Sequence, residues 1–87
     1  MQYEVRIKNE KKIFSKLPQY IKDTLLVLID ELREEGPEQP EWYNYSRLGE
    51  NQYHCHLARK WVACWRQVEK SFVIEVYYAG SREKAPY

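Results

Sequence analysis

The sequence predicts an α+β fold in which an N-terminal strand and two helices pack on one face of an antiparallel β-meander. Two observations predict this fold. Apolar residues recur at helical spacing up to Gly36, and after Pro40 their spacing changes to two. The later apolar segments are separated by turns of two or three residues, which join antiparallel neighbours. A chain of 87 residues is long enough for one domain, expected to span residues 1–87.

The N-terminal segment is predicted to contain a short strand and a short helix. Residues 2–8 alternate between apolar and polar side chains, which is typical of a strand. Asn9 is an acceptable N-cap for a helix over residues 10–17. Pro18 then interrupts this helix and suits the first turn of the next one, where its missing N–H costs nothing.

A second, longer helix follows Pro18 and is the clearest element in the chain. Gly36 and Pro37 are expected to end it. Its spacing of four, three and four residues gives a continuous apolar stripe formed by Ile21, Leu25, Leu28 and Leu32. Three further residues are expected to widen the stripe so that the helix packs on more than one neighbour: Leu26, Val27 and Ile29.

Four segments after Pro40 are rich in aromatic and β-branched residues and are predicted to be strands. They are Trp42–Leu48, Tyr53–Ala58, Trp61–Val68 and Phe72–Ala79. The turns between them are predicted at residues 49–51, 59–60 and 69–70. This layout predicts a meander with one face covered by the helices.

Strand alternation places the side chains of the second meander strand on two faces of the sheet. Tyr53, Cys55 and Leu57 are apolar and are expected to face the helices. His54 and His56 therefore project about 7 Å apart from the opposite face, which is expected to be exposed. Cys55 cannot share a metal ion with the two histidines, and no second ligand pair completes a site. We therefore expect no metal and no cofactor.

The third meander strand leaves its orientation open. One face carries Trp61, Ala63, Trp65 and Gln67, and the other carries Val62, Cys64, Arg66 and Val68. The pattern does not decide which set faces the helices, although Val62, Cys64 and Val68 have the character of core residues. Cys55 and Cys64 could face each other across the hairpin, but two buried free thiols are expected.

The net charge of +1 conceals an uneven distribution along the chain. Residues 1–22 carry a net +4, residues 23–41 a net −6 and residues 42–87 a net +3. The near-neutral total argues against binding free nucleic acid by charge alone. No apolar run reaches the roughly 20 residues that span a bilayer, and the N-terminus lacks the apolar region of a signal peptide. A cytoplasmic protein without membrane contact is expected.

Imidazole, cationic and aromatic side chains gather from Trp42 onward, where ten of the thirteen aromatic residues lie. Aromatic faces stack bases, cations hold phosphates, and imidazoles titrate near neutral pH. Each group alone is also explained by solvation or cross-strand packing, so it is their combination that favours holding and cutting RNA. The residues are His54, His56, Arg59, Lys60, Trp61, Trp65, Arg66, Tyr77, Tyr78, Arg82 and Lys84.

The order of several segments is that of a known family. They are Leu17-Pro18 before an amphipathic helix, Trp42, Leu48-Gly49, Tyr53–Leu57 and Val76–Tyr87. With these segments the chain resembles the RelE/ParE superfamily of bacterial toxins, which belong to type II toxin–antitoxin pairs. The resemblance covers nearly the whole chain, and its strongest part is the closing strand followed by Gly-x-Arg-Glu and a nearby tyrosine. It implies two helices on an antiparallel sheet with an open concave face.

Two activities divide this superfamily, and the resemblance implies one of them. RelE-like members are endoribonucleases that cut mRNA in the ribosomal A site, and ParE-like members inhibit DNA gyrase. The two histidines with Arg82 and Tyr87 favour the nuclease. The implied partner is a cognate antitoxin that covers or displaces the site, and the oligomeric state stays open. A non-catalytic module that binds an antitoxin or RNA is the alternative from another class.

The resemblance also implies the roles of individual residues. RelE-like toxins carry lysines or histidines at the positions of His54 and His56, and their closing arginine and tyrosine map onto Arg82 and Tyr87. The implied reaction is attack by the RNA 2′-OH on the adjacent phosphorus, with one histidine as base. The other histidine or Tyr87 is the acid or stacks a base, and Arg82 stabilises the phosphate. The residues expected to hold the strand are Arg59, Lys60, Trp61, Arg66 and Lys84.

The chain departs from the RelE pattern on the third meander strand. The RelE-type arginine falls near Val62 or Ala63 here. Its phosphate contact is therefore absent, or is supplied by Arg66 or Lys60.

Overall fold

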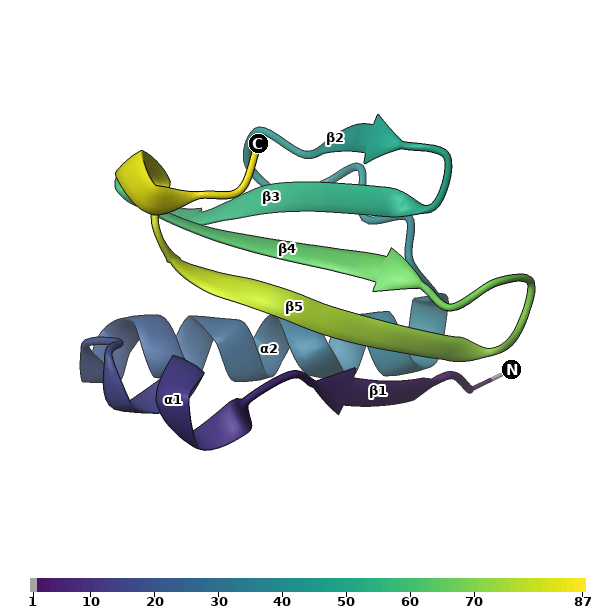
Figure 1. Cartoon of the computed structure of the whole chain (residues 1–87), viewed down its shortest axis with the longest axis horizontal. Helices are drawn as coiled ribbons and strands as arrows, with labels where there is room; N and C mark the ends of the chain where they lie inside the picture. Colours follow the sequence, from purple (N-terminus) through teal and green to yellow (C-terminus); the bar gives the residue numbers. More distant parts are fainter. Residues whose placement is uncertain (1) are drawn as a thin grey trace.

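The computed structural model describes residues 2–87, in which two helices cover one face of a five-stranded sheet (Figure 1). The strand order is β1-β5-β4-β3-β2, with β1 parallel to β5 and the other pairs antiparallel. The predicted α+β architecture is confirmed, and the sheet is mixed because the N-terminal strand joins its edge. The elements are β1 (Glu4–Ile7), α1 (Glu10–Ser15), α2 (Gln19–Glu35), β2 (Ser46–Gly49), β3 (Gln52–Ala58), β4 (Trp61–Gln67), β5 (Val73–Ser81) and the short 3-10 helix η1 (Arg82–Lys84).

The strand β1 is shorter than predicted and lies beside the first half of β5. Its register runs from Glu4 opposite Val73 to Ile7 opposite Val76. The backbone N–H of Tyr3 also donates to the carbonyl of Arg33 at 2.7 Å, which ties this edge to the end of α2.

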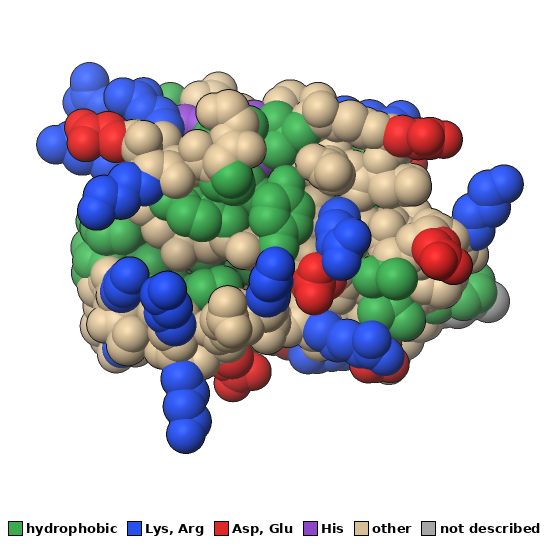
Figure 2. Space-filling view, viewed as in Figure 1, with side chains coloured by type: hydrophobic (Ala, Val, Ile, Leu, Met, Phe, Trp, Pro, Cys, Tyr) green, Lys and Arg blue, Asp and Glu red, His purple; other side chains and the backbone are tan. Residues whose placement is uncertain are grey.

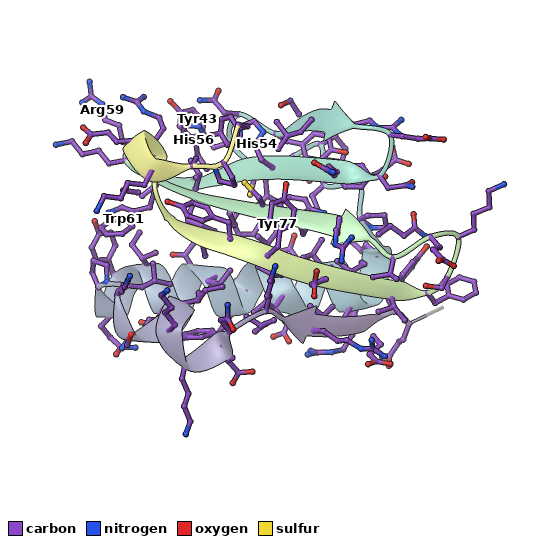
Figure 3. All side chains as sticks on the ribbon, in the orientation of Figure 1. Tyr43, His54, His56, Arg59, Trp61 and Tyr77 are labelled. Atoms are coloured by element: carbon purple, nitrogen blue, oxygen red, sulfur yellow. The ribbon has the colours of Figure 1, made fainter. Side chains whose placement is uncertain are left out.

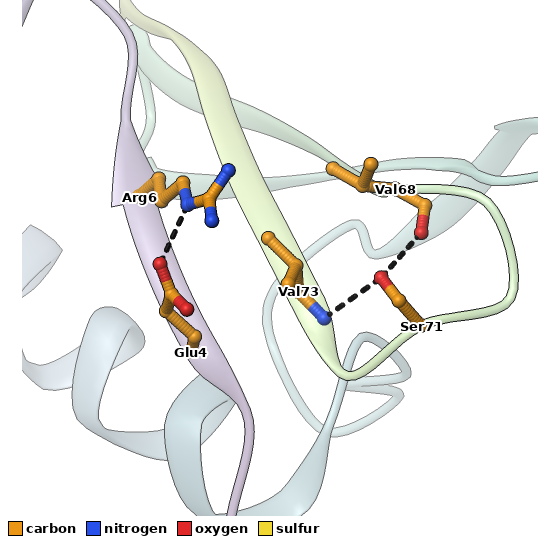
Figure 4. Close-up of polar contacts among 5 residues, drawn as sticks. All are labelled: Glu4, Arg6, Val68, Ser71 and Val73. Carbon is orange, nitrogen blue, oxygen red and sulfur yellow. Dashed lines mark hydrogen bonds and ion pairs between the residues drawn. The ribbon is translucent and has the colours of Figure 1, made fainter.

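Figure 4 shows the polar contacts around this edge and the neighbouring β4–β5 turn. Ser71 Oγ donates to the carbonyl of Val68 at 2.6 Å and accepts the N–H of Val73 at 3.3 Å, so one hydroxyl closes the turn. Arg6 Nε lies 2.6 Å from a carboxylate oxygen of Glu4, and both side chains are exposed. An exposed pair of this kind contributes little to stability.

The two helices differ from the predictions at their ends. Asn9 does not cap α1 with its side chain; it adopts a left-handed conformation (φ 52°), and its carbonyl accepts the N–H of Ile13. Helix α1 ends at Ser15, so Leu17 lies beyond it and is buried in the core. Pro18 precedes the first turn of α2, and its carbonyl accepts the N–H groups of Ile21 and Lys22, each at 3.0 Å.

Helix α2 buries the predicted stripe against the sheet. Its buried residues are Ile21, Leu25, Leu28, Ile29 and Leu32. The expectation that Leu26 and Val27 widen the stripe is wrong, because each is 51% exposed. One sheet face covers one side of the helix, and these two side chains lie on the side turned to solvent.

The orientation of β4 is decided by Trp65, which is fully buried with Ala63 in the core beneath the helices. Its ring stacks on Tyr53 at 6.1 Å between centroids, and its indole Nε1–H donates to the carbonyl of Pro37 at 2.8 Å. Val62 and Cys64 are also fully buried, but they lie on the other face of the sheet. The structure thus decides the orientation that the sequence left open: the large indole fills the space under α2, and Val62 and Cys64 are buried, as their core character predicts, on the opposite face.

The first meander strand is also shorter than predicted. Strand β2 begins at Ser46, and the segment from Trp42 to Tyr45 forms a turn in which the Tyr45 N–H donates to the carbonyl of Trp42 at 3.1 Å. Asn44 adopts φ 51° in this turn, a backbone conformation that asparagine tolerates better than most residues. At the other end of the sheet, β5 extends to Ser81 rather than ending at Ala79.

Gly36→Ala is expected to destabilise the protein by about 1–3 kcal/mol. Gly36 ends α2 with φ 95°, and a Cβ there would lie 2.9 Å from the ring of Tyr3, which packs edge-on against Phe72. The matched control is Gly49→Ala, because a Cβ at Gly49 meets nothing within 4 Å. Urea unfolding of both variants checks the prediction, and equal stability of the two variants would contradict it.

Candidate functional site

The two histidines lie on the face of β3 opposite the helices, as the alternation predicts (Figure 3). His54 pairs in register with Cys64, and His56 pairs with Val62. Each histidine is only 8% exposed, so the expectation of an open face is wrong at these two positions. The turn before β2 lies alongside β3, where the carbonyl of Tyr43 accepts the N–H of His56 at 2.8 Å.

Four rings form a cluster on this face. The His54 and His56 rings have centroids 5.8 Å apart. The ring of Tyr87 lies 4.6 Å from His54, and the ring of Tyr43 meets His56 edge-on at 5.5 Å and 86°. Tyr43 is 61% exposed and Tyr87 is 54% exposed, so both tyrosines border solvent while the histidines lie beneath them.

The surroundings of His54 favour its neutral form. Burial lowers the pKa of His54 below its ordinary value, and the nearby His56 lowers it further when charged. A backbone hydrogen bond with Ser46 opposes this shift. Ser46 Oγ also lies 2.9 Å from His54 Nδ1 in a hydrogen bond, which orients the ring. His54 is therefore a neutral imidazole at neutral pH, able to accept a proton.

His56 differs from His54 in its hydrogen bonding. Its Nδ1 is buried and has no hydrogen-bond partner among residues 2–87. A buried polar atom without a partner is costly, and a ligand that supplies one gains affinity.

Tyr87 carries a phenol that stays protonated at neutral pH. Burial raises the pKa of Tyr87, and the positive charge of Arg82 partly opposes the rise. The hydroxyl is therefore a proton donor, and the exposed ring offers a face for stacking.

The predicted cations fall into separate groups. The backbone N–H of Arg82 donates to the carbonyl of Lys60 at 2.8 Å, and both side chains line a surface hollow of about 210 Å³ with Trp61. Arg59 precedes Lys60 in the β3–β4 turn and is exposed. Arg66 lies on the histidine face, but its guanidinium is paired with Glu75 at 2.9 Å. Lys84 lies in η1 and lines a different hollow, beside α1.

The position of the expected strand arginine has no cation. Val62 is directly across from His56 and is fully buried, and Ala63 points into the core beneath the helices. Because Arg66 is held by Glu75, Lys60 is the better placed of the two suggested replacements, at the end of the sheet beside Arg82.

Tyr43, a member of the ring cluster, and Ser46, which hydrogen-bonds to His54, are site residues that the sequence does not predict. The predicted strand Trp42–Leu48 contains both residues, and strand alternation cannot predict a carbonyl or hydroxyl turned toward β3. The one available signal was Asn44, since asparagine between two tyrosines marks a turn.

The two cysteines are free and lie on opposite faces of the sheet, so they do not face each other. Burial raises the pKa of both thiols to about 12, so both stay protonated. Burial and the nearby Cys64 raise the pKa of Tyr77 also to about 12. These groups pack the sheet and do not act as nucleophiles.

Residues 2–87 contain no group of three or more histidine, cysteine, aspartate or glutamate side chains arranged to hold a metal ion. Within the same residues, no helix is long and apolar enough to cross a membrane.

Comparison with known proteins places the fold. No protein-family model matches the chain, and no curated protein matches it in sequence. Among solved structures, a chain of the archaeal RelE–RelB complex from Pyrococcus horikoshii superposes with a TM-score of 0.73 at 20% identity, covering 98% of this chain and 100% of that one. A chain of the E. coli DinJ–YafQ toxin–antitoxin complex gives 0.77 at 13% identity, with 100% of both chains covered.

A copper-bound mutant toxin from Helicobacter pylori gives a TM-score of 0.60 at 13% identity, covering 94% of this chain and 97% of that one. At these identities the likeness concerns the fold. The chain has the RelE-like α+β fold that the sequence resemblance predicted.

The stability of the protein is expected to fall as the pH falls below about 6.5. The pKa of His54 is lower in the folded state than in the unfolded state, so the unfolded chain binds the extra proton and acid favours unfolding. Urea unfolding near pH 7.5 and pH 5.5 measures the loss. His54→Gln is expected to lose less stability over this range than the native protein, and equal losses would contradict the assignment.

Proposed function

We propose that this chain is the toxin of a toxin–antitoxin pair and an endoribonuclease that cleaves mRNA on the ribosome. The cluster of His54, His56 and Tyr87 carries the proposal, because it joins two imidazoles and a phenol on one sheet face. The RelE-like fold supports it, since two of the structures that share this fold are toxin–antitoxin or RelE–RelB complexes.

The proposed reaction takes its nucleophile, the 2′-OH, from the RNA itself, and its acid, base and cations from this chain. A base removes the proton of the 2′-OH, and the resulting oxygen attacks the adjacent phosphorus. The bond from phosphorus to the 5′-oxygen breaks, and an acid donates a proton to that oxygen. The products are a 2′,3′-cyclic phosphate and a 5′-OH end, and cations offset the charge that develops on the phosphate.

The electrostatics favour different roles for the clustered residues. His54 is the general base, because its lowered pKa leaves it neutral and Ser46 fixes its ring. Tyr87 keeps its proton and is placed against His54, so it serves as the acid or stacks on a base of the RNA. The unpartnered Nδ1 of His56 binds the substrate or shares the acid role.

The cations at the end of the sheet stabilise the phosphate in this proposal. Arg82 carries the main share, and Lys60 takes the place of the strand arginine that Val62 replaces. Arg59 and Trp61, in the same region, hold the RNA strand further.

The RNA reaches the histidines when the C-terminal segment moves. Tyr87 covers His54 with an exposed ring, and among residues 2–87 the segment 85–87 has one backbone hydrogen bond outside helices and strands, from Ala85 to Arg82. Its displacement costs little, so an RNA base can take the place of the ring against His54 or stack on the displaced ring. In this open arrangement Tyr87 is the stacking residue and His56 takes the acid role.

A cognate antitoxin and the ribosome complete the proposal. A net charge of +1 gives weak attraction to free RNA, so a ribosome that presents the strand suits this chain. An antitoxin segment that covers the cluster would keep the nuclease inactive in the pair.

The double substitution His54→Ala/His56→Ala is expected to abolish growth arrest on induction and to slow mRNA cleavage by at least about 10²-fold, the effect of one acid or base. Primer extension of mRNA after brief induction measures it. Because both side chains are buried, His54→Gln/His56→Gln tests the same chemistry with better retention of packing. Cleavage that persists in a folded double variant would refute the assignment.

Arg82→Ala is expected to lower cleavage by about 10²–10³-fold and to change stability by less than about 0.5 kcal/mol. The side chain of Arg82 is exposed, and its backbone N–H makes the contact with Lys60. Lys70→Ala removes an exposed cation from the β4–β5 turn and serves as the control, with cleavage unchanged. A parallel loss of stability and cleavage in Arg82→Ala would point to a structural role.

A non-catalytic binding module is the second candidate, favoured by the burial of both histidines and the absence of a cation opposite His56. The induction experiment separates the candidates. Discrete breaks inside translated codons support the nuclease. Growth arrest with intact transcripts and inhibited supercoiling by purified gyrase would instead support a ParE-like activity, and normal growth would support the binding module.

A further inference from the structure

A groove runs along the free edge of β5, away from the histidine cluster. β1 ends at Ile7, opposite Val76, whereas β5 continues to Ser81. Residues 77–81 therefore have no strand on this side within the described chain, and α1 lies next to them instead (Figure 1). The short α1 does not fill the space that a longer β1 would take.

The groove consists of three adjoining hollows of about 270, 320 and 210 Å³. The first and second share Lys16, Tyr78 and Ala79 in their lining. The second and third share Trp61 and Ser81. The shared walls make one continuous path from α1 to η1.

The walls of this path are strongly basic. Six cations and one carboxylate, that of Glu83, line the three hollows. Among residues 2–87 the ion pairs involve Arg6, Arg33 and Arg66, so all six groove cations are unpaired. Figure 2 shows blue side chains gathered over α1 and the neighbouring end of the sheet. The six are Lys8, Lys12, Lys16, Lys60, Arg82 and Lys84.

Aromatic side chains lie between the cations. Tyr78 lines the first two hollows and Trp61 lines the last two, and both are half-buried. Cations beside half-exposed rings are the combination that holds single-stranded nucleic acid, with phosphates on the cations and bases on the rings.

We propose that this groove binds the single-stranded RNA that flanks the cleavage point. Its six unpaired cations suit the phosphates of an RNA backbone. An acidic peptide would use these cations as well, but it would leave the aromatic rings unused, whereas RNA bases stack on them. The groove ends at Lys60 and Arg82, the corner that the proposed function gives to the reacting phosphate, so one strand passes from the histidines around η1 into the groove. That this RNA is the substrate of a nuclease rests on the proposed function. The binding of single-stranded RNA in the groove does not.

Lys12→Gln/Lys16→Gln tests the groove, with Lys22→Gln/Lys70→Gln as a control of equal charge outside it. The oligonucleotides carry 2′-O-methyl groups, which remove the attacking hydroxyl, so that no cleavage occurs during the measurement and the histidines stay in place. The probe is a fluorescein-labelled oligouridine RNA of about 12 nucleotides, within the usual size of such sites. The groove variant is expected to bind about tenfold more weakly, with a salt slope smaller by about 1.4, or about 0.7 for each lost phosphate contact.

Two comparisons decide whether the groove holds the flank of the strand. A trinucleotide of the same composition, which fits at the histidines alone, is expected to bind the native-lysine protein and the groove variant equally. Equal weakening of the long RNA by both lysine pairs would overturn the proposal in favour of general attraction. A glutamate-rich peptide of similar charge that binds more tightly than the RNA, with the same lysine dependence, would assign the groove to a protein.

Tyr78→Leu tests stacking apart from charge. It is expected to weaken binding of the long RNA by at least fivefold, with Tyr20→Leu, an exposed tyrosine on α2, as the unaffected control. Thermal unfolding of each variant shows whether it is folded.

The groove and the catalytic proposal fail independently. If the lysine and tyrosine variants lose RNA binding but the native protein cleaves no RNA, the groove proposal is supported and the nuclease proposal is refuted. If the native protein cleaves RNA but those variants bind RNA as well as it does, the groove proposal is refuted and the nuclease proposal is supported.

Discussion

The hydrogen bond from the Trp65 indole to the carbonyl of Pro37 connects the two sides of this molecule. Trp65 is fully buried, so its N–H must find an acceptor inside the protein. The carbonyl that it binds follows directly after α2 and fixes the start of the chain that leads to β2. Gln39, buried in the same segment, adds hydrogen bonds to the carbonyls of Glu31 and Gly36. The helical layer and the edge of the sheet are thereby held in one arrangement.

The geometry of the histidine face follows from this anchor. The chain beyond Pro37 turns at Asn44 and lies along β3, where it brings the carbonyl of Tyr43 to the backbone of His56 and the hydroxyl of Ser46 to His54. The ring of Tyr43 from this segment packs against His56, Tyr87 covers His54, and burial is the largest cause of the lowered pKa of His54. The segment that the Trp65–Pro37 contact holds on the helical side thus continues to the histidine face, where the Ser46 hydroxyl orients the His54 ring.

Acidic and basic side chains lie on different parts of the surface, although their sum is close to zero. The acidic residues after Lys22 gather at the end of α2 and the following segment, where Glu31, Glu35, Glu38 and Glu41 line one hollow. The groove beside β5 carries six cations and one carboxylate. A protein with a net charge of +1 thus presents one acidic and one basic surface, and salt screens the field of each within about 10 Å at moderate ionic strength.

The amino-acid sequence alone determined the elements and the faces of β3, because helical and strand periodicities are local properties of the chain. The stripe from Ile21 to Leu32 and the opposite directions of Cys55 and His54 needed no other information. Only the tertiary structure decided which face of β4 meets the helices, since that choice depends on the volume that Trp65 fills under α2. It also decided that the histidines are covered and that a groove opens beyond Ile7, because both depend on where segments distant in sequence end beside one another.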